Sequence, residues 1–156
     1  MKLPESTEWL LHSVTTLALH EPGRTVSAVQ LAEYYDVPAA YLAKQLQTLV
    51  RAGILVAATG PRGGFRLARP ADEITLLDIV EAVDGSAPPY QCNEIRQRGI
   101  GAVPPEQCRR TCFIAARMSA AHAAWRASLR DVTIADVVGT LPRGTPGRVR
   151  ELLARP

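Results

Sequence analysis

Two pairs of residues in this chain have the side chains and the spacing to hold a metal. Cys108 and Cys112 are four positions apart, and so are Glu8 and His12 near the N-terminus. Residues with this spacing lie on one face wherever the chain is helical. Zinc accepts thiolate, carboxylate and imidazole ligands in a tetrahedral site, whereas two thiolates alone are too few for most iron–sulfur clusters. These four residues are therefore candidate metal ligands.

Each candidate also has an interpretation that needs no metal. Glu8 falls in the first turn of an expected helix, where a carboxylate interacts favourably with the helix dipole. His12 can be an exposed or hydrogen-bonded histidine, and attraction between a cation and the dipole explains His20 at the end of the same helix. Cys108 and Cys112 can be unligated thiols, although the two arginines between them favour ionisation. Spacing alone leaves these alternatives open.

The stretch 26–69 predicts a DNA-binding element, whose activity a metal held by the candidate ligands would control. A capping-box pattern begins a helix at Ser27, and Asp36-Val37-Pro38 ends it. A second helix with regularly spaced leucines stops at Gly53, and two short apolar runs then flank a Gly-rich turn. This order indicates a winged helix-turn-helix, so we expect a fold that is mainly α-helical with a small β-wing and that binds DNA.

The outward face of the second helix and the tip of the wing supply the expected DNA contacts. Lys44 and Gln45 are placed to read base edges, and Tyr41 and Thr48 to hold phosphates. An arginine at the wing tip can enter the minor groove. The alternative for each residue is a solvated face. The predicted contacts are Tyr41, Lys44, Gln45, Thr48, Arg51 and Arg62.

The rest of the chain divides by composition. Residues 1–84 form the expected DNA-binding domain, and 85–105 form a loop rich in Gly and Pro that contains Cys92. Residues 106–138 contain a long Ala-rich helix, expected from 106 to 130, and a short last helix. Close helix contact through small side chains suits a dimer interface. We expect 139–156 to be a flexible tail rich in Pro, Gly and Arg.

Composition excludes several classes of protein. The 156 residues suit one domain with a dimerisation arm, mean hydropathy is near zero, and no apolar run is long enough for a membrane span. An odd number of cysteines without a signal peptide predicts a reducing, cytoplasmic location. No phosphate-binding loop, dinucleotide-binding glycine pattern or nucleophile–base pair is present, so we do not expect an enzyme. The net charge of +3 is compatible with nucleic-acid binding without proving it.

Residues 8–138 resemble the Rrf-type winged-helix regulators typified by IscR and NsrR. The resemblance rests on the helix-turn-helix, the wing sequence at 60–65, the segment 74–85, a downstream cysteine region and the closing segment 133–138. It implies a homodimer that binds operator DNA. For members with cysteines in this region, it also implies an iron–sulfur cluster that controls DNA binding.

The cysteine spacing departs from the family's commonest pattern of three closely spaced cysteines. Fifteen residues separate Cys92 from Cys108, and three separate Cys108 from Cys112. Together with Glu8 and His12, the two close cysteines are similar to the ligand set of the RsrR-type redox-sensing members. The resemblance thus implies a [2Fe–2S] cluster with Glu8 and His12 contributed by the other subunit of the dimer. Cys92 is the rival ligand.

The resemblance further implies a switch in which the redox state of the cluster controls operator binding. Trp9, between the two ligands of the first helix, is a candidate residue to respond to that change, and ordinary packing is the alternative. Cluster loss on exposure to nitric oxide or iron limitation, a structural zinc site and a regulator without metal remain open. The signal, the operator and the sign of regulation do not follow from the sequence.

Overall fold

The computed structural model describes residues 2–60 and 63–154, which form two compact units. Lys2–Gly85 together with the chain from Leu129 onward forms one, here called the winged-helix unit. Ser86–Ser128 forms the other, here called the cysteine unit because it contains all three cysteines. None of the described helices is both long and apolar enough to cross a membrane.

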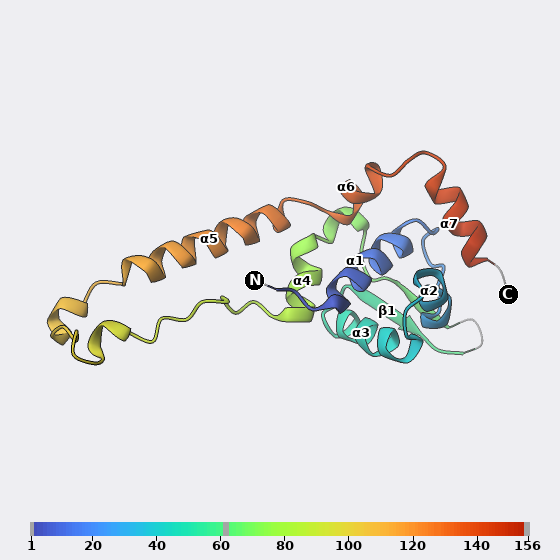
Figure 1. The fold of residues 1–156 in the computed structure, drawn as a ribbon. Helices are drawn as coiled ribbons and strands as arrows, with labels where there is room; N and C mark the ends of the chain where they lie inside the picture. Colours follow the sequence, from blue (N-terminus) through green and yellow to red (C-terminus); the bar gives the residue numbers. More distant parts are fainter. Residues whose placement is uncertain (1, 61–62, 155–156) are drawn as a thin grey trace. The chain divides into compact units, whose positions relative to one another are not determined.

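The winged-helix unit is a helical assembly with one small sheet, as the sequence predicts (Figure 1). Its sheet is an antiparallel pair of strands with Leu55 opposite Leu67 and Ala58 opposite Gly64. The elements in chain order are α1 Glu5–Ala18, α2 Ala28–Tyr35, α3 Ala39–Arg51, β1 Leu55–Ala58, β2 Gly64–Leu67, the 3-10 helix η1 Ala71–Glu73, α4 Leu76–Asp84, α6 Ile134–Gly139 and α7 Thr145–Leu153.

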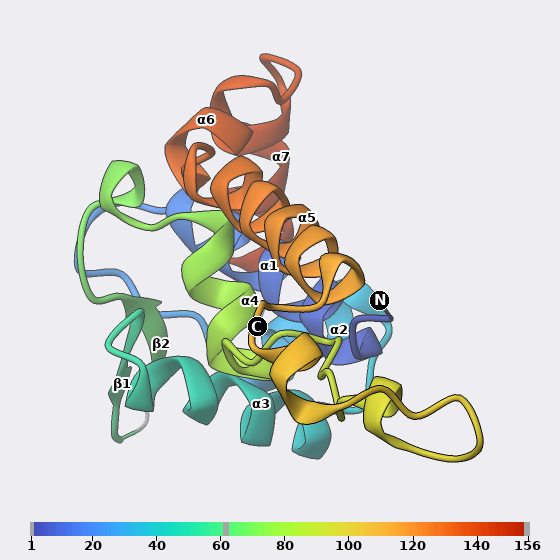
Figure 2. The same cartoon turned by 90° about the vertical axis from the view of Figure 1, so that its left-hand side faces the viewer.

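Regularly spaced aliphatic side chains hold these elements together. α1 packs against α3, α4 and α6, while α3 packs against α2, α4 and β1. Figure 2 shows the β1–β2 hairpin beside the end of α3. The core contains the fully buried residues Leu10, Val14, Leu31, Leu42, Leu46, Leu49, Ile74, Ile79 and Ile134. Burial of one such side chain contributes about 1.5–3 kcal/mol, so this contiguous core accounts for the stability of the unit.

Three capping boxes begin helices, and the one at Ser27 confirms the pattern predicted from the sequence. Ser27, Thr75 and Thr133 each accept a hydrogen bond from the backbone N–H three residues later, and the side chain at that position accepts one in return. Each box satisfies two backbone donors that a helix N-terminus otherwise leaves unpaired. Thr75 and Thr133 also pair with each other in an isolated β-bridge, which joins α4 to α6.

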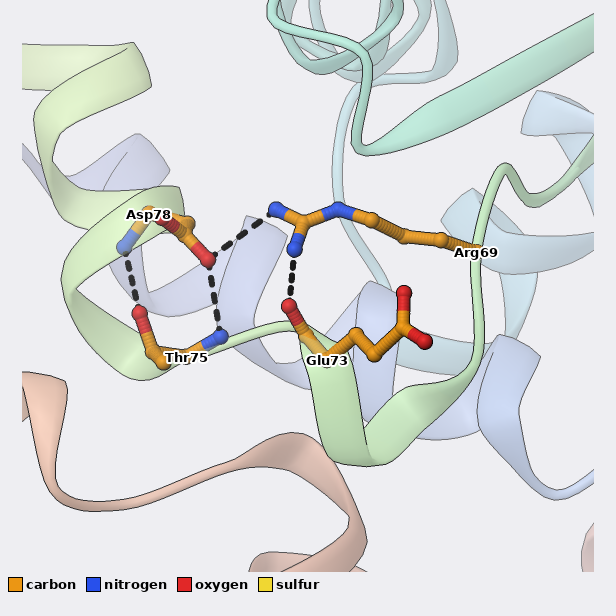
Figure 3. Close-up of polar contacts among 4 residues, drawn as sticks. All are labelled: Arg69, Glu73, Thr75 and Asp78. Atoms are coloured by element: carbon orange, nitrogen blue, oxygen red, sulfur yellow. Dashed lines mark hydrogen bonds and ion pairs between the residues drawn. The ribbon is translucent and has the colours of Figure 1, made fainter.

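The second strand of the wing, β2, is attached to the rest of the unit at both of its ends. At the start of β2, Gly64 has a φ of +153°, and a Cβ placed there would lie 2.5 Å from the carbonyl oxygen of Val26. Only glycine permits this close approach, which lets Val26 pair with Phe65 in an isolated antiparallel bridge. Beyond β2, Arg69 forms an ion pair of 3.0 Å with Asp78 of α4 and donates to the Glu73 carbonyl (Figure 3).

The cysteine unit contains two 3-10 helices and one long α-helix. These are η2 Ile95–Gln97, η3 Pro105–Cys108 and α5 Phe113–Arg130. The expected start of the long helix at 106 is wrong. The first helical backbone bond runs from the Ala116 N–H to the Cys112 carbonyl at 2.9 Å, while Pro105 starts a separate 3-10 turn.

The expectation of a flexible tail at 139–156 is also wrong for much of that segment. α7 occupies Thr145–Leu153, and its Val149 and Leu153 are buried. Two hydrogen bonds hold this helix to the winged-helix unit, from Gln30 Nε2 to the Leu153 carbonyl at 3.0 Å and from Arg150 Nε to the Leu19 carbonyl at 3.0 Å. Composition pointed to disorder because the few apolar residues here acquire a partner surface only in the folded unit.

Candidate DNA-binding surface and cysteine site

The second helix of the helix-turn-helix, α3, has one buried and one exposed face. Leu42, Leu46 and Leu49 are fully buried against the core. The opposite side carries the predicted DNA contacts, of which Tyr41, Lys44 and Arg51 are exposed and Gln45 and Thr48 are partly exposed. These side chains can reach a DNA groove because the leucine stripe fixes which face of α3 is turned outward.

Two of these side chains contact each other directly. Arg51 Nη2 donates a hydrogen bond to Thr48 Oγ1 at 3.1 Å, so the last turn of α3 presents a hydroxyl and a guanidinium side by side. Such a pair suits a phosphate oxygen. Arg62, predicted at the wing tip, lies outside the described residues.

Glu8 and His12 share one side of α1, as their spacing predicts. Both side chains are exposed, and both line a cavity of about 260 Å³ together with Trp9, Tyr35 and Val37. The Tyr35 hydroxyl donates to the His12 carbonyl at 3.1 Å, and its ring lies 5.8 Å from the imidazole. Burial raises the pKa of Tyr35. The arrangement leaves a carboxylate and an imidazole accessible at one small hollow.

Trp9 connects this hollow to the DNA-reading helix. Its indole meets the ring of Tyr41 edge-to-face, with centroids 5.6 Å apart and planes at 84°. This is a favourable geometry for two aromatic rings. Trp9 therefore belongs to the α1 face that carries Glu8 and His12, and it also touches the first turn of α3.

In the cysteine unit, Cys112 lies immediately before α5 and accepts hydrogen bonds from its first backbone N–H groups. The N–H groups of Ala115 and Ile114 and the positive charge of Arg96 lower the pKa of the Cys112 thiol. This placement replaces the expected one, in which Cys108 and Cys112 lie on one face of the long helix. Cys108 instead ends the 3-10 helix η3.

An ion pair accompanies the two cysteines. Arg96 bonds to the two carboxylate oxygens of Glu94, at 2.5 Å and 2.7 Å, and to the Arg110 carbonyl at 3.2 Å. Glu94 also interacts with Cys108, and the charge of Arg96 acts on both thiols. Sequence reasoning missed both residues, because nothing in the spacing of an acid and a base within a loop indicates that they will meet the cysteines.

The predicted ligands therefore occur as two half-sets. Glu8 and His12 belong to the winged-helix unit, and Cys108 and Cys112 to the cysteine unit, where Cys92 is exposed. Within the described part of a single chain, no three His, Cys, Asp or Glu side chains gather in a metal-binding group.

A helix-turn-helix with an exposed reading face and a β-wing defines a DNA-binding transcription regulator. Residues 3–140 match the model of the Rrf2 family, described as an iron-dependent transcriptional regulator. The chain belongs to this family. The family is one of transcription regulators, and the similar proteins are named as regulators rather than as enzymes.

Curated relatives support the assignment. Protein aau3 of Rhizobium meliloti is 31% identical over 144 residues, which cover 92% of this chain and 88% of that protein. BadM of Rhodopseudomonas palustris, named in the helix-turn-helix class of transcriptional regulators, is 44% identical over 80 residues. That match covers 51% of either protein, so the chain spans about half the length of BadM.

Solved structures show the same fold. CymR of B. subtilis, titled the global cysteine regulator, superposes with a TM-score of 0.69 at 20% identity and covers 91% of this chain and 99% of its own. IscR of T. potens gives a TM-score of 0.66 at 19% identity, with coverage of 93% and 95%. The expected fold class is therefore confirmed.

Proposed function

We propose that this regulator binds operator DNA as a homodimer and that a [2Fe–2S] cluster controls the binding through its redox state. Cys108 and Cys112 of one subunit would hold the cluster together with Glu8 of the partner subunit and His12 of the partner subunit. The set resembles that of the RsrR-type members of the family. When bound, the cluster supplies reversible one-electron chemistry.

The observation that carries the proposal is the placement of the donors: Cys108 ends η3 and Cys112 precedes α5, while Glu8 and His12 line one hollow beside α1. Metal ligation requires thiolates, and the backbone N–H groups at the start of α5 lower the pKa of Cys112. The donor chemistry also fits on the other half-set, because Glu8 and His12 are exposed beside a common hollow. A carboxylate and an imidazole in place of two thiolates leave a less electron-rich iron, as two histidines do in Rieske centres.

Dimerisation is supported by the exposure of α5. None of its eighteen residues is buried within the chain, and Phe113, Ile114 and Met118 are 70%, 60% and 42% exposed. Large apolar side chains gathered on one exposed helix indicate a surface that another chain covers. A twofold dimer would prefer an operator with inverted half-sites about one helical turn apart, or a multiple of it.

The contact between Trp9 and Tyr41 offers a route from the ligands to the DNA. Glu8, Trp9 and His12 belong to the same two turns of α1, so a shift of this face moves the indole. The indole packs on Tyr41, which is itself a predicted phosphate contact at the start of α3. A small rearrangement at α1 would thus change how α3 is presented to the operator.

The first experiment is to measure iron, acid-labile sulfide and zinc in protein purified without oxygen. About two irons and two sulfides per chain are expected, and they should be lost in Cys112→Ala and Glu8→Ala but retained in the matched control Cys92→Ala. About four irons per chain, with loss in Cys92→Ala, would assign Cys92 as a ligand and favour cluster loss as the switch. Zinc alone, or no metal, would exclude the redox mechanism.

A further inference from the structure

A second cavity, of about 420 Å³, lies at the base of the wing, away from α3 and from Glu8 and His12. Its walls come from the end of α1, the 20–24 turn and the chain after β2. Because β2 runs from Gly64 at the wing turn to Leu67 at the opposite end, these walls lie at the end of the hairpin that is remote from the wing tip. The volume is within the range of small-molecule sites.

The lining of this cavity combines apolar side chains with arginines. Leu17, Leu67 and Ala71 contribute an apolar surface, and Arg24 and Arg66 contribute positive charge. Arg69 also lines the cavity, but its guanidinium is already bound to Asp78 and to the Glu73 carbonyl (Figure 3). The Arg66 side chain makes one long hydrogen bond, of 3.3 Å, to the Leu67 carbonyl, which leaves donors for a ligand.

His20, which also lines the cavity, provides a second, independent observation, because its ring nitrogens lack hydrogen-bond partners in the described part of the chain. Neither ring nitrogen is exposed, and neither has a hydrogen-bond partner among the described residues. Burial lowers the pKa of His20, as do the charges of Arg24 and Arg150. This shift disfavours the His20 cation that the sequence interpretation placed at the end of α1. A buried polar group without a partner is uncommon in a folded protein and is often found at functional sites.

We propose that this cavity binds a small organic carboxylate, with its apolar body against Leu17, Leu67 and Ala71 and its carboxylate between Arg24 and Arg66. Arginine matches a carboxylate through paired hydrogen bonds. Glu21 also lines the cavity, and its negative charge reduces the net positive charge of the lining, which disfavours compact ions of high charge such as phosphate. The chemistry of the walls thus selects a monoanion with an apolar body. This inference is independent of the proposed cluster.

The test uses the full chain, isotope-labelled, with benzoate as the probe and benzyl alcohol as its neutral counterpart. Benzoate should shift the amide resonances of Leu17, Leu67 and Ala71 saturably, and benzyl alcohol should not. Arg24→Gln and Arg66→Gln should each weaken benzoate binding about tenfold. Arg148→Gln, which removes an exposed arginine of α7 outside the cavity, is the matched control and should leave binding unchanged.

Three outcomes would overturn the proposal. The first is a lack of saturable shifts at the cavity residues in the unsubstituted protein. The second is equal binding of inorganic phosphate and benzoate, which would reduce the site to a general anion patch. The third is a shift of the same amides by a random DNA duplex, lost in Arg24→Gln and Arg66→Gln, which would assign the arginines to DNA phosphates.

Discussion

The winged-helix unit and the cysteine unit obtain their order from different sources. The first has a continuous core of fully buried aliphatic residues and three capping boxes. In the second, no described residue is buried, and its best-connected groups are the Glu94–Arg96 ion pair and the Cys112 thiol. A segment without a core cannot offset the conformational entropy of ordering its chain. This difference supports our proposal that a partner subunit and a bound cluster complete the cysteine unit.

The largest expected difference between the two units is in the free energy of unfolding lost when an apolar side chain is truncated to alanine. Leu46→Ala removes a fully buried side chain of α3 and should lower the free energy of unfolding by about 2–5 kcal/mol. Ile114→Ala, on the exposed part of α5, should change it by less than about 0.5 kcal/mol once the dimer is dissociated by dilution. Urea denaturation of both variants at low protein concentration measures the contrast, and equal losses would show that the two units share one core.

Substitutions in the two units should affect different properties: DNA sequence preference in the winged-helix unit and the response to redox conditions in the cysteine unit. Gln45→Ala should reduce discrimination between operator and random DNA by about 1–3 kcal/mol if this side chain reads a base edge. Its response to oxidation and reduction should persist. Cys112→Ala should do the reverse and keep sequence preference while losing the response. Fluorescence anisotropy with both DNAs under both redox conditions tests this, and an equal loss of specific and random binding in Gln45→Ala would remove Gln45 from the base-reading set.

The ion pairs Arg69–Asp78 and Arg96–Glu94, one in each unit, allow a closer comparison. The Asp78 carboxylate receives hydrogen bonds from the Thr75 backbone and from Arg69, and these outweigh burial and lower its pKa. Asp78→Asn should lower the free energy of unfolding by about 1 kcal/mol, mainly through the helix cap, since a partly exposed ion pair contributes little. Glu94→Gln, in the coreless unit, should have no measurable effect on unfolding.

The pH dependence of the Asp78 contribution has a definite sign. Because the pKa is lower in the folded state, this stabilisation is present above the ordinary aspartate value of 3.8 and is lost as the pH falls through the folded-state value. Thermal unfolding from pH 7 to pH 3 should therefore show a gap between the unsubstituted protein and Asp78→Asn that narrows towards acid. A gap that stays constant would assign the effect of the substitution to packing.

The smallest expected effect concerns thiol reactivity in the metal-free protein. The lowered pKa of Cys112 implies a larger thiolate fraction at neutral pH than an ordinary cysteine has, and the Arg96 charge contributes to it. Arg96→Gln should slow alkylation of Cys112 by iodoacetamide a few-fold, while exposed Cys92 in the same sample should be unaffected. Mass spectrometry of both peptides provides the measurement, and equal slowing at the two sites would exclude a local charge effect.

Local sequence determined the parts of this protein that rest on short-range rules. The capping boxes, the turn at Pro38 and the leucine stripe of α3 follow from hydrogen bonds and side-chain periodicity within a few residues, so these elements could be predicted. The family resemblance carried the candidate ligands, and the shared hollow at Glu8 and His12 agrees with their spacing.

Only the tertiary structure decided the features that join distant segments. α7 is a helix because Val149 and Leu153 find a surface on the winged-helix unit, and Trp9 meets Tyr41 only after α1 and α3 have packed. The start of α5 at Phe113, with Cys112 accepting its first N–H groups beside Arg96, depends on a loop that returns from residue 96. Such contacts bring together residues far apart in the chain, and no local pattern encodes them, because their energy exists only once the intervening chain has folded.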